Sequence, residues 1–202
     1  MDRLRVNSDA GQNLRVNPDT GAIAGVDGAL KYAANDQNAG KTPGVAGAAY
    51  TNPDIDPATA TTLYDIDAAL DTLVIQNSPN DGVLNTVGSL GAGNSGNVKA
   101  DFDFAPLISL LRKGGFDVEA VLGFLKKPAA TLDVGNVLGF DIGQGSKSGL
   151  AAVQLKGESS SRLYEIDLAS GRATDQGRIA GGATIRGLAI ALDSDQRGDD
   201  SD

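Results

Sequence analysis

Apolar and polar residues alternate near the N-terminus in a way that predicts a β-hairpin. The segment LRVN occurs at residues 4–7 and again at residues 14–17, and each copy runs into a turn that ends in Asp-x-Gly. A period of two followed by such a turn is typical of a strand entering a tight connection. We expect a third strand near residues 22–28, where the sequence continues as AIAGVDG.

The same order of strands is predicted twice more along the chain. Each set has a strand of small residues, two alternating strands and a short polar outer strand. The two sets are residues 44–52, 61–70, 71–82 and 84–91, and residues 137–145, 148–157, 161–171 and 172–181. Four antiparallel strands with small residues on the first are typical of a propeller blade. We therefore predict an all-β, β-propeller-like fold of about three four-stranded antiparallel blades.

A short motif is duplicated between two of these units. LYEID (163–167) repeats LYDID (63–67) almost letter for letter. We interpret it as a strand that enters a turn at its aspartate rather than as a binding motif used twice. The motif falls on the second strand of one predicted unit and the third of another, which indicates a shift of one strand between the two.

The ends of the repeat raise the question of ring closure. Residues 184–192, TIRGLAIAL, read as another innermost strand, and we expect it to pair with the strand near residues 2–7. Closure would remove edge strands, which invite aggregation. Propellers typically have four to eight blades. Three blades therefore leave three alternatives open: part of a longer propeller, an open crescent, or a ring completed by self-association.

Residues 102–128 break the strand pattern and predict a helical hairpin inserted between two blades. The first helix would end at RKGG, and the second would begin at Asp117 and end before Pro128. An apolar helix stripe either binds a partner or covers blade surface of its own domain, and we favour the second interpretation. The candidate interaction residues are Leu107, Leu111, Val121 and Leu125.

The composition of the chain excludes several kinds of site and partner. The 202-residue chain carries a formal charge of −9, and its 17 basic residues are scattered among 26 acidic ones, which argues against a nucleic-acid partner. Neither cysteine nor histidine is present. Disulfides, cysteine nucleophiles, histidine bases and histidine zinc sites are therefore excluded. No signal peptide is recognisable and no apolar run approaches the roughly 20 residues that span a bilayer, so we expect a soluble chain with no membrane partner.

Paired carboxylates are the main candidates for chemistry. Asp65 and Asp67 alternate along one strand, as do Glu165 and Asp167, so each pair shares one face and could bind a cation or act as acid and base. We favour a structural role for both pairs. Asp67 and Asp167 lie where strands turn, and aspartate there accepts backbone hydrogen bonds.

The C-terminal residues 193–202, DSDQRGDDSD, begin like a calcium loop. The candidate metal ligands are Asp193, Asp195 and Asp199, but the glutamate at position twelve of such a loop is missing. We favour an acidic disordered tail here, after a single domain at residues 1–192. No cofactor is predicted, and calcium is the one ion that these residues suggest.

Several segments together resemble a bacterial domain-of-unknown-function family, number four-three-nine-four, which is grouped with β-propellers. The segments are DRLRVNSDAGQNLRVNPDTGAIAGVDGAL, AAYTN, TTLYDID, LDTL, LNTVGSLG, GFDI and SRLYEIDLASGRATDQGRI. The resemblance covers most of the chain except about residues 98–135. The resemblance implies a propeller-like fold, and this chain looks like the C-terminal three blades of it. It also implies export or a location on the cell surface. It supplies no activity and no catalytic residues.

The favoured function is a non-enzymatic structural or interaction module that binds a protein partner or associates with itself. The alternatives are a carboxylate- or metal-dependent hydrolase or lyase on a propeller scaffold, and an extracellular calcium-binding module. The hydrolase would need acidic side chains from different blades to converge on one pocket. The candidates for that convergence are Asp54, Asp101, Asp103 and Asp141.

Overall fold

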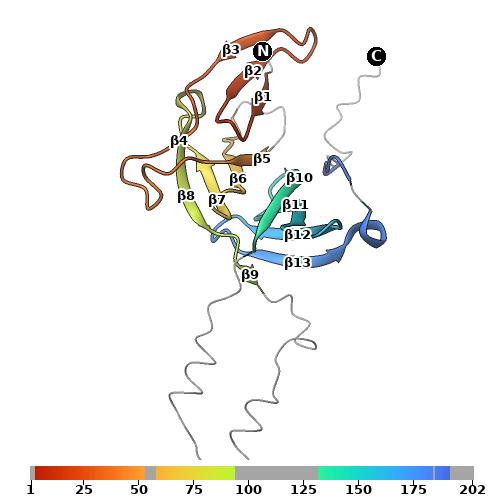
Figure 1. The fold of residues 1–202 in the computed structure, drawn as a ribbon. Helices are drawn as coiled ribbons and strands as arrows, with labels where there is room; N and C mark the ends of the chain where they lie inside the picture. The colour runs from red at the N-terminus through yellow and green to blue at the C-terminus, as the bar shows by residue number, and fades with distance from the viewer. Residues whose placement is uncertain (1–2, 53–57, 94–131, 184, 192–202) are drawn as a thin grey trace, which may run out of the picture.

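The computed structural model describes residues 3–52, 58–93, 132–183 and 185–191, and it shows three β-sheets (Figure 1). The first sheet contains β1 (Leu4–Asn7), β2 (Asn13–Val16) and β3 (Ile23–Val26). The second contains β4 (Lys31–Tyr32), β5 (Val45–Tyr50), β6 (Leu63–Asp67), β7 (Thr72–Gln76) and β8 (Val83–Ser89). The third contains β9 (Ala92–Gly93), β10 (Val134–Ile142), β11 (Ser148–Leu155), β12 (Ser161–Asp167) and β13 (Ala173–Arg178).

Two 3-10 helices complete the regular structure of these residues: η1 (Pro79–Asp81) between β7 and β8, and η2 (Ile179–Gly182) after β13. No helix in this part of the chain is long and apolar enough to cross a membrane. The predicted all-β class is confirmed for the residues that the structure describes.

The two five-stranded sheets share one topology. Strands β5 to β8 form an antiparallel meander, and β4 adds to β8 in the parallel direction. Strands β10 to β13 form the same meander, and β9 adds to β13 in parallel. Both meanders and the three-stranded sheet are the ones that the alternation predicts, whereas the short parallel strands were not predicted.

One turn is used in all three sheets. An Asn or Asp at the end of a strand accepts backbone N–H groups two or three residues later through its side-chain oxygen, and the residue four positions on has a positive φ. The three pairs of residues are Asn17 with Gly21, Asp67 with Asp71, and Asp167 with Gly171. The predicted turn role of Asp67 and Asp167 is confirmed. The one-strand shift is confirmed too, since LYDID lies on β6, the second strand of its meander, and LYEID lies on β12, the third.

The main core lies between the two five-stranded sheets. It includes Ile66 and Leu73 from one sheet and Phe140 and Ile166 from the other, and all four are buried. Strands β5 and β10 lie side by side near the middle of Figure 1. Gly47 permits this approach, because a Cβ at that position would lie 2.8 Å from the Val137 side chain.

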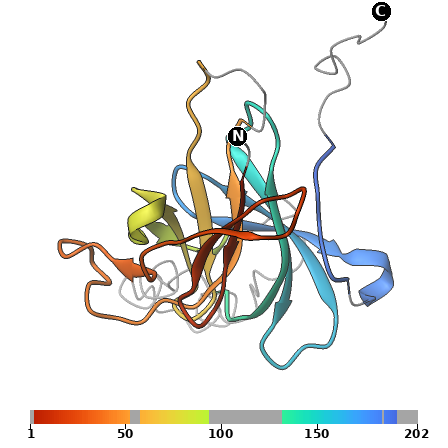
Figure 2. The same ribbon diagram turned by 90° about the horizontal axis from the view of Figure 1, so that it is seen from above.

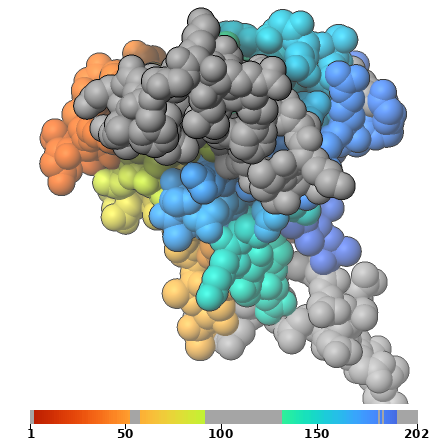
Figure 3. Space-filling model, turned by 90° about the horizontal axis from the view of Figure 1, so that it is seen from below, coloured from red at the N-terminus to blue at the C-terminus, as the bar shows by residue number. Residues whose placement is uncertain are grey.

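Two further contacts hold these sheets together. Gly88 of β8 packs against the backbone carbonyl of Ser170 in the turn after β12, where a side chain has no room. Seen from below, blue residues of the third sheet lie against yellow-green residues of the second (Figure 3). Asp71, with φ 51°, accepts the Val134 N–H at 2.9 Å through its side chain and so ties the β6–β7 turn to β10. Burial raises the pKa of the Asp71 carboxyl.

The predicted closing strand is wrong. Residues 185–191 form no strand, and β1 is an edge strand whose partner is β2. The segment runs along β10 instead. The Ile190 N–H donates to the Asp141 carboxylate at 2.6 Å, and the backbone nitrogen of Leu188 lies 2.5 Å from the place where a Cβ on Gly139 would stand. These contacts place the segment beside β10.

The predicted helical hairpin at residues 102–128, with its interaction residues Leu107, Leu111, Val121 and Leu125, lies outside the described residues. So do Asp193, Asp195 and Asp199 of the C-terminal calcium-like segment. The all-β structure around them supplies no support for the hairpin.

Candidate functional site

The three-stranded sheet has its apolar side chains on the outside. Pairing of β1 with β2, and of β2 with β3, places six aliphatic residues opposite one another on one face. We call this the aliphatic face, and its residues are Leu4, Val6, Leu14, Val16, Ile23 and Val26. Leu4 is 57% exposed, Ile23 62% and Val26 77%. The sheet lies at the top of Figure 1 and is nearest the viewer in Figure 2, which looks down on the molecule.

The polar residues of the same strands point inward. The Arg5 side chain is only 7% exposed and Asn13 only 1%. Both donate to the backbone carbonyl oxygen of Pro79, at 3.2 and 2.7 Å, and Gln76 of β7 donates to the same oxygen at 2.7 Å. The sheet is therefore attached to the second sheet through hydrogen bonds, which explains why its aliphatic face is left outside.

An ion-pair cluster within the three-stranded sheet fixes the Arg5 side chain that makes this attachment. The Asp27 carboxylate accepts from Arg5 at 3.1 Å and from Arg15 at 2.8 Å. The hydrogen bond from Arg15 lowers the pKa of the Asp27 carboxyl. Asp27 is almost completely buried, so removal of one arginine would leave a charge without its full compensation.

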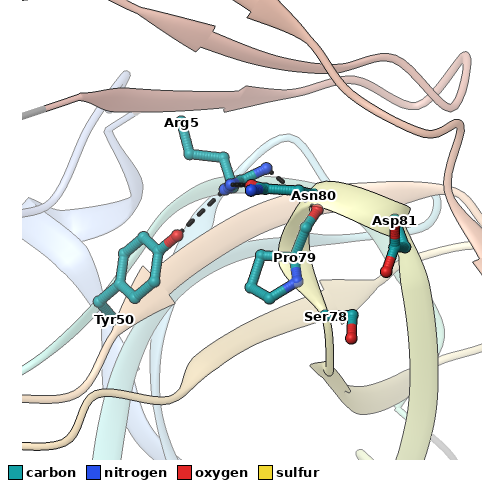
Figure 4. Close-up of a pocket in the computed structure, with 6 residues that line it drawn as sticks. All are labelled: Arg5, Tyr50, Ser78, Pro79, Asn80 and Asp81. Atoms are coloured by element: carbon teal, nitrogen blue, oxygen red, sulfur yellow. Dashed lines mark hydrogen bonds between the residues drawn. The ribbon is translucent and has the colours of Figure 1, made fainter.

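A hollow of about 440 Å³ opens beside Arg5 (Figure 4). It is lined by Arg5, Tyr50 and residues 78–81. Arg5 donates from Nε to the Tyr50 hydroxyl at 3.0 Å and from Nη2 to the Asn80 Oδ1 at 2.8 Å. The Arg5 guanidinium also donates inward to Asn13, Asp27 and the Pro79 carbonyl, so its nitrogens already bind groups of the protein. We therefore interpret the hollow as the outer edge of the contact between the first and second sheets.

Asp65 is a buried carboxylate that stands out among the described residues. It is fully buried on β6, and neither of its carboxylate oxygens has a hydrogen-bond partner within the described residues. Burial raises the pKa of Asp65 to about 7, and the positive charge of Arg5 opposes the rise. Asp65 faces Val74 across the sheet, which makes Gln76 its diagonal neighbour on the same face. It therefore lies under the polar side of the three-stranded sheet.

Sequence reasoning placed Asp65 and Asp67 on one face but did not predict the burial of Asp65. The signal was Leu63, which shares that face and is buried. Asp67 is well satisfied by comparison. Its Oδ1 accepts the Gly44 and Ala69 N–H groups at 3.1 and 2.9 Å, and its Oδ2 accepts the Tyr32 hydroxyl at 2.5 Å.

The other predicted carboxylates do not converge in the described structure. The Asp141 carboxylate accepts backbone N–H groups from Ile142 and Ile190. Glu165 is exposed and accepts from Ser148 and Gln176 on neighbouring strands. Among the residues that the structure describes, no three acidic side chains gather closely enough to hold a metal ion. The positions 54, 101 and 103 lie outside the described residues.

Antiparallel sheets that share one Asx turn define an all-β protein with repeated units. Its first sheet exposes apolar side chains and buries polar ones, and so gives the protein an apolar surface. A family model described as "Domain of unknown function (DUF4394)" matches residues 1–122 and 123–189, so the chain belongs to this family. The resemblance of its sequence segments is thereby confirmed. No curated protein and no solved structure matches the chain.

Proposed function

We propose that the chain is a non-enzymatic structural and interaction module that binds another protein through the aliphatic face. The observation that carries this is the inverted three-stranded sheet, with Ile23 and Val26 exposed while Arg5 and Asn13 are buried. Contiguous exposed apolar patches are rare on monomeric proteins and mark sites of association. Hydrogen bonds from Arg5 and Asn13 on the polar inner face to the Pro79 carbonyl hold the sheet in this orientation.

We also propose a β-propeller-like arrangement of the sheets. Two features support it. The two meanders have one topology, and their first strands, β5 and β10, lie together with Gly47 at the contact. Small residues on the first strand of each unit suit the crowded axis of a propeller. The hydrolase and calcium alternatives depend mostly on carboxylates outside the described residues, and the described candidate, Asp141, accepts the backbone N–H groups of Ile142 and Ile190.

The proposed function is tested by placing a photoreactive amino acid at Val26, on the aliphatic face, and at Gln176, an exposed position on β13. Irradiation in an extract of the source cells is expected to attach a protein at position 26 and not at position 176. The captured protein is then purified, and its affinity for the wild-type chain is compared with that for Val26→Lys. We expect a loss of at least about tenfold, since the lysine would be desolvated on binding.

Two outcomes would overturn the proposal. One is equal capture at the two positions, which would mean non-specific adhesion. The other is turnover in a hydrolase substrate screen at a rate that Val26→Lys leaves unchanged. A partner whose affinity depends on position 26 but not on Gln176→Lys would support it.

A further inference from the structure

The first sheet is attached to the second mainly by polar contacts. The aliphatic residues of β1, β2 and β3 belong to neither of the buried hydrophobic clusters in the described part of the chain. The attachment includes the hydrogen bonds of Arg5 and Asn13 to the Pro79 carbonyl, and that of Asn7 to the Gln76 Oε1 at 3.1 Å. We call these contacts the polar joint. Opening the polar joint exposes little apolar surface, so it requires less free energy than unfolding the whole chain.

The polar joint covers a carboxyl group that lacks a hydrogen-bond partner. Asp65 on β6 is fully buried, and neither of its oxygens accepts from any described residue. The Asn7 Oδ1 is likewise buried without a donor, while the Asn7 amide nitrogen bonds to Gln76, the diagonal neighbour of Asp65. A proton on Asp65 removes the buried charge and turns one of these oxygens into a donor. The protonated form therefore suits the closed joint.

The ionised form of Asp65 is poorly compensated. Its direct neighbours on β5 and β7 are the apolar residues Ala48 and Val74. Burial raises the pKa of the Asp65 carboxyl to about 7, and the positive charge of Arg5 opposes this rise without cancelling it. Arg5 is already paired with Asp27 at 3.1 Å. The cost of burying the charge thus outweighs the attraction to this arginine.

Other charged and titratable groups surround the polar joint. On the first sheet, the hydrogen bond from Arg15 lowers the pKa of Asp27. Next to β6, burial raises the pKa of Tyr32 above its ordinary value, and Tyr32 donates to Asp67, the next acidic residue on the face of Asp65. Burial would raise the pKa of Asp36 in the loop after β4, but hydrogen bonds lower it overall. Asp27, Tyr32 and Asp36 therefore keep one charge state between about pH 5 and about pH 8.

We propose that the polar joint is a pH-sensitive switch, which stays closed while Asp65 carries its proton and opens more readily as the carboxylate forms. In the open state Asp65 meets water and ionises with the ordinary pKa of 3.8, whereas in the closed state its pKa is about 7. The population of the open state therefore grows about tenfold for each pH unit between these values, and the growth ends above about 7. The inference goes beyond the proposed function and does not depend on it, because Asp65 lies on the inner side of the first sheet.

Amide hydrogen exchange, followed residue by residue by NMR, tests the switch. The Gly28 N–H donates to the Asn80 carbonyl oxygen at 2.8 Å, from the first sheet to η1, so its protection measures closure of the joint. After correction for the intrinsic exchange rate, protection of Gly28 is expected to fall close to a hundredfold from about pH 5 to about pH 7 and then to level off. Amides in the pairing of β11 with β12 are expected to stay more strongly protected at each pH, because opening is confined to the first sheet.

Two variants and one spectroscopic signal assign the effect to Asp65. Asp65→Asn removes the ionisation, so protection of Gly28 is expected to become independent of pH. Asp19→Asn makes the same chemical change at an exposed turn position and is expected to keep the wild-type dependence. The ¹³C shift of the Asp65 carboxyl carbon, recorded over the same pH range, is expected to titrate near pH 7. The wild-type series is informative whether or not either variant folds.

Three results would overturn the switch. One is protection of Gly28 that does not change with pH while the Asp65 carbon titrates. Another is protection that rises with pH, which would mean that Arg5 binds the ionised carboxylate and tightens the joint. The third is equal protection of Gly28 and of the β11–β12 amides at every pH, which would mean that the first sheet opens only when the whole chain unfolds. Capture at position 26 is measured separately, so failure of the switch leaves the proposed function standing, and the reverse holds too.

Discussion

The buried carboxyl of Asp65 makes the stability of this protein depend on pH. Its pKa is raised from the ordinary value of 3.8 to about 7 by burial without a hydrogen-bond partner. Below pH 3.8 the group is protonated in both the folded and the unfolded chain and costs nothing. Between pH 3.8 and about 7 the unfolded chain releases the proton first, so stability falls as the pH rises. Above about 7 both states are ionised and the loss is complete.

The resulting loss in the free energy of unfolding is large for a single residue. One pKa unit is worth about 1.4 kcal/mol, so the full effect at neutral pH is of the order of 4 kcal/mol. Asp65→Asn removes the ionisation and keeps the shape of the side chain. The free energy of unfolding of Asp65→Asn minus that of the wild type is therefore expected to grow by about 1.4 kcal/mol per pH unit from pH 4 to pH 7, and then to level off.

Urea unfolding at a series of pH values from about 4 to about 8 measures this difference. The amide has donors of its own that need partners, which adds an offset independent of pH, so the slope is the informative quantity. Asp19→Asn, the same chemical change at an exposed turn position, is the control for the loss of one carboxylate. A flat difference for Asp65→Asn, or one that shrinks as the pH rises, would refute the reasoning.

Three further substitutions test the joints between the sheets by thermal or urea unfolding. Gly88→Ala is expected to cost about 1–3 kcal/mol, because the new Cβ meets a backbone carbonyl of the facing turn, while Gly187→Ala meets nothing within 4 Å and should leave the midpoint unchanged. Asp71→Ala loses the acceptor for the Val134 N–H at a positive φ and is expected to cost about 1–3 kcal/mol, whereas Asp71→Asn should retain most of the stability; equal losses would contradict this role. Arg5→Met leaves buried acceptors without donors and is expected to cost about 3 kcal/mol, with a smaller loss for Arg5→Lys; no loss in either variant would mean that the sheet is held by other contacts.

The strands could be predicted because their information is local. Alternation with a period of two, ended by an Asx turn such as the one at Asp167, is contained in a dozen consecutive residues. The same rule put the apolar residues of LRVN on one face and the polar ones on the other. It could not say which face would turn inward, because that depends on the Pro79 carbonyl and Asp27, which are distant in sequence from at least one of their partners.

The path of residues 185–191 and the burial of Asp65 could not be predicted from the sequence for related reasons. Residues 185–191 alternate well enough to suggest a strand, but a carboxylate at Asp141 and the space beside Gly139 offered their backbone a different place. Asp65 reads as a polar position on a half-exposed strand. The packing of another sheet over it makes it buried, and the one sign of this within β6 is the apolar Leu63 on the same face.

Three side-chain donors share the Pro79 carbonyl, and this has a consequence for how the sequence of this protein can vary. The acceptor belongs to the main chain, so exchanging the side chain at position 79 removes no hydrogen bond as long as the backbone path of η1 is kept. The donors Arg5, Asn13 and Gln76 lie on three different strands, and each bond depends on the identity of the residue at that position. Relatives that keep this joint are therefore expected to be recognised by the three donors, while the residue at its centre is free to drift.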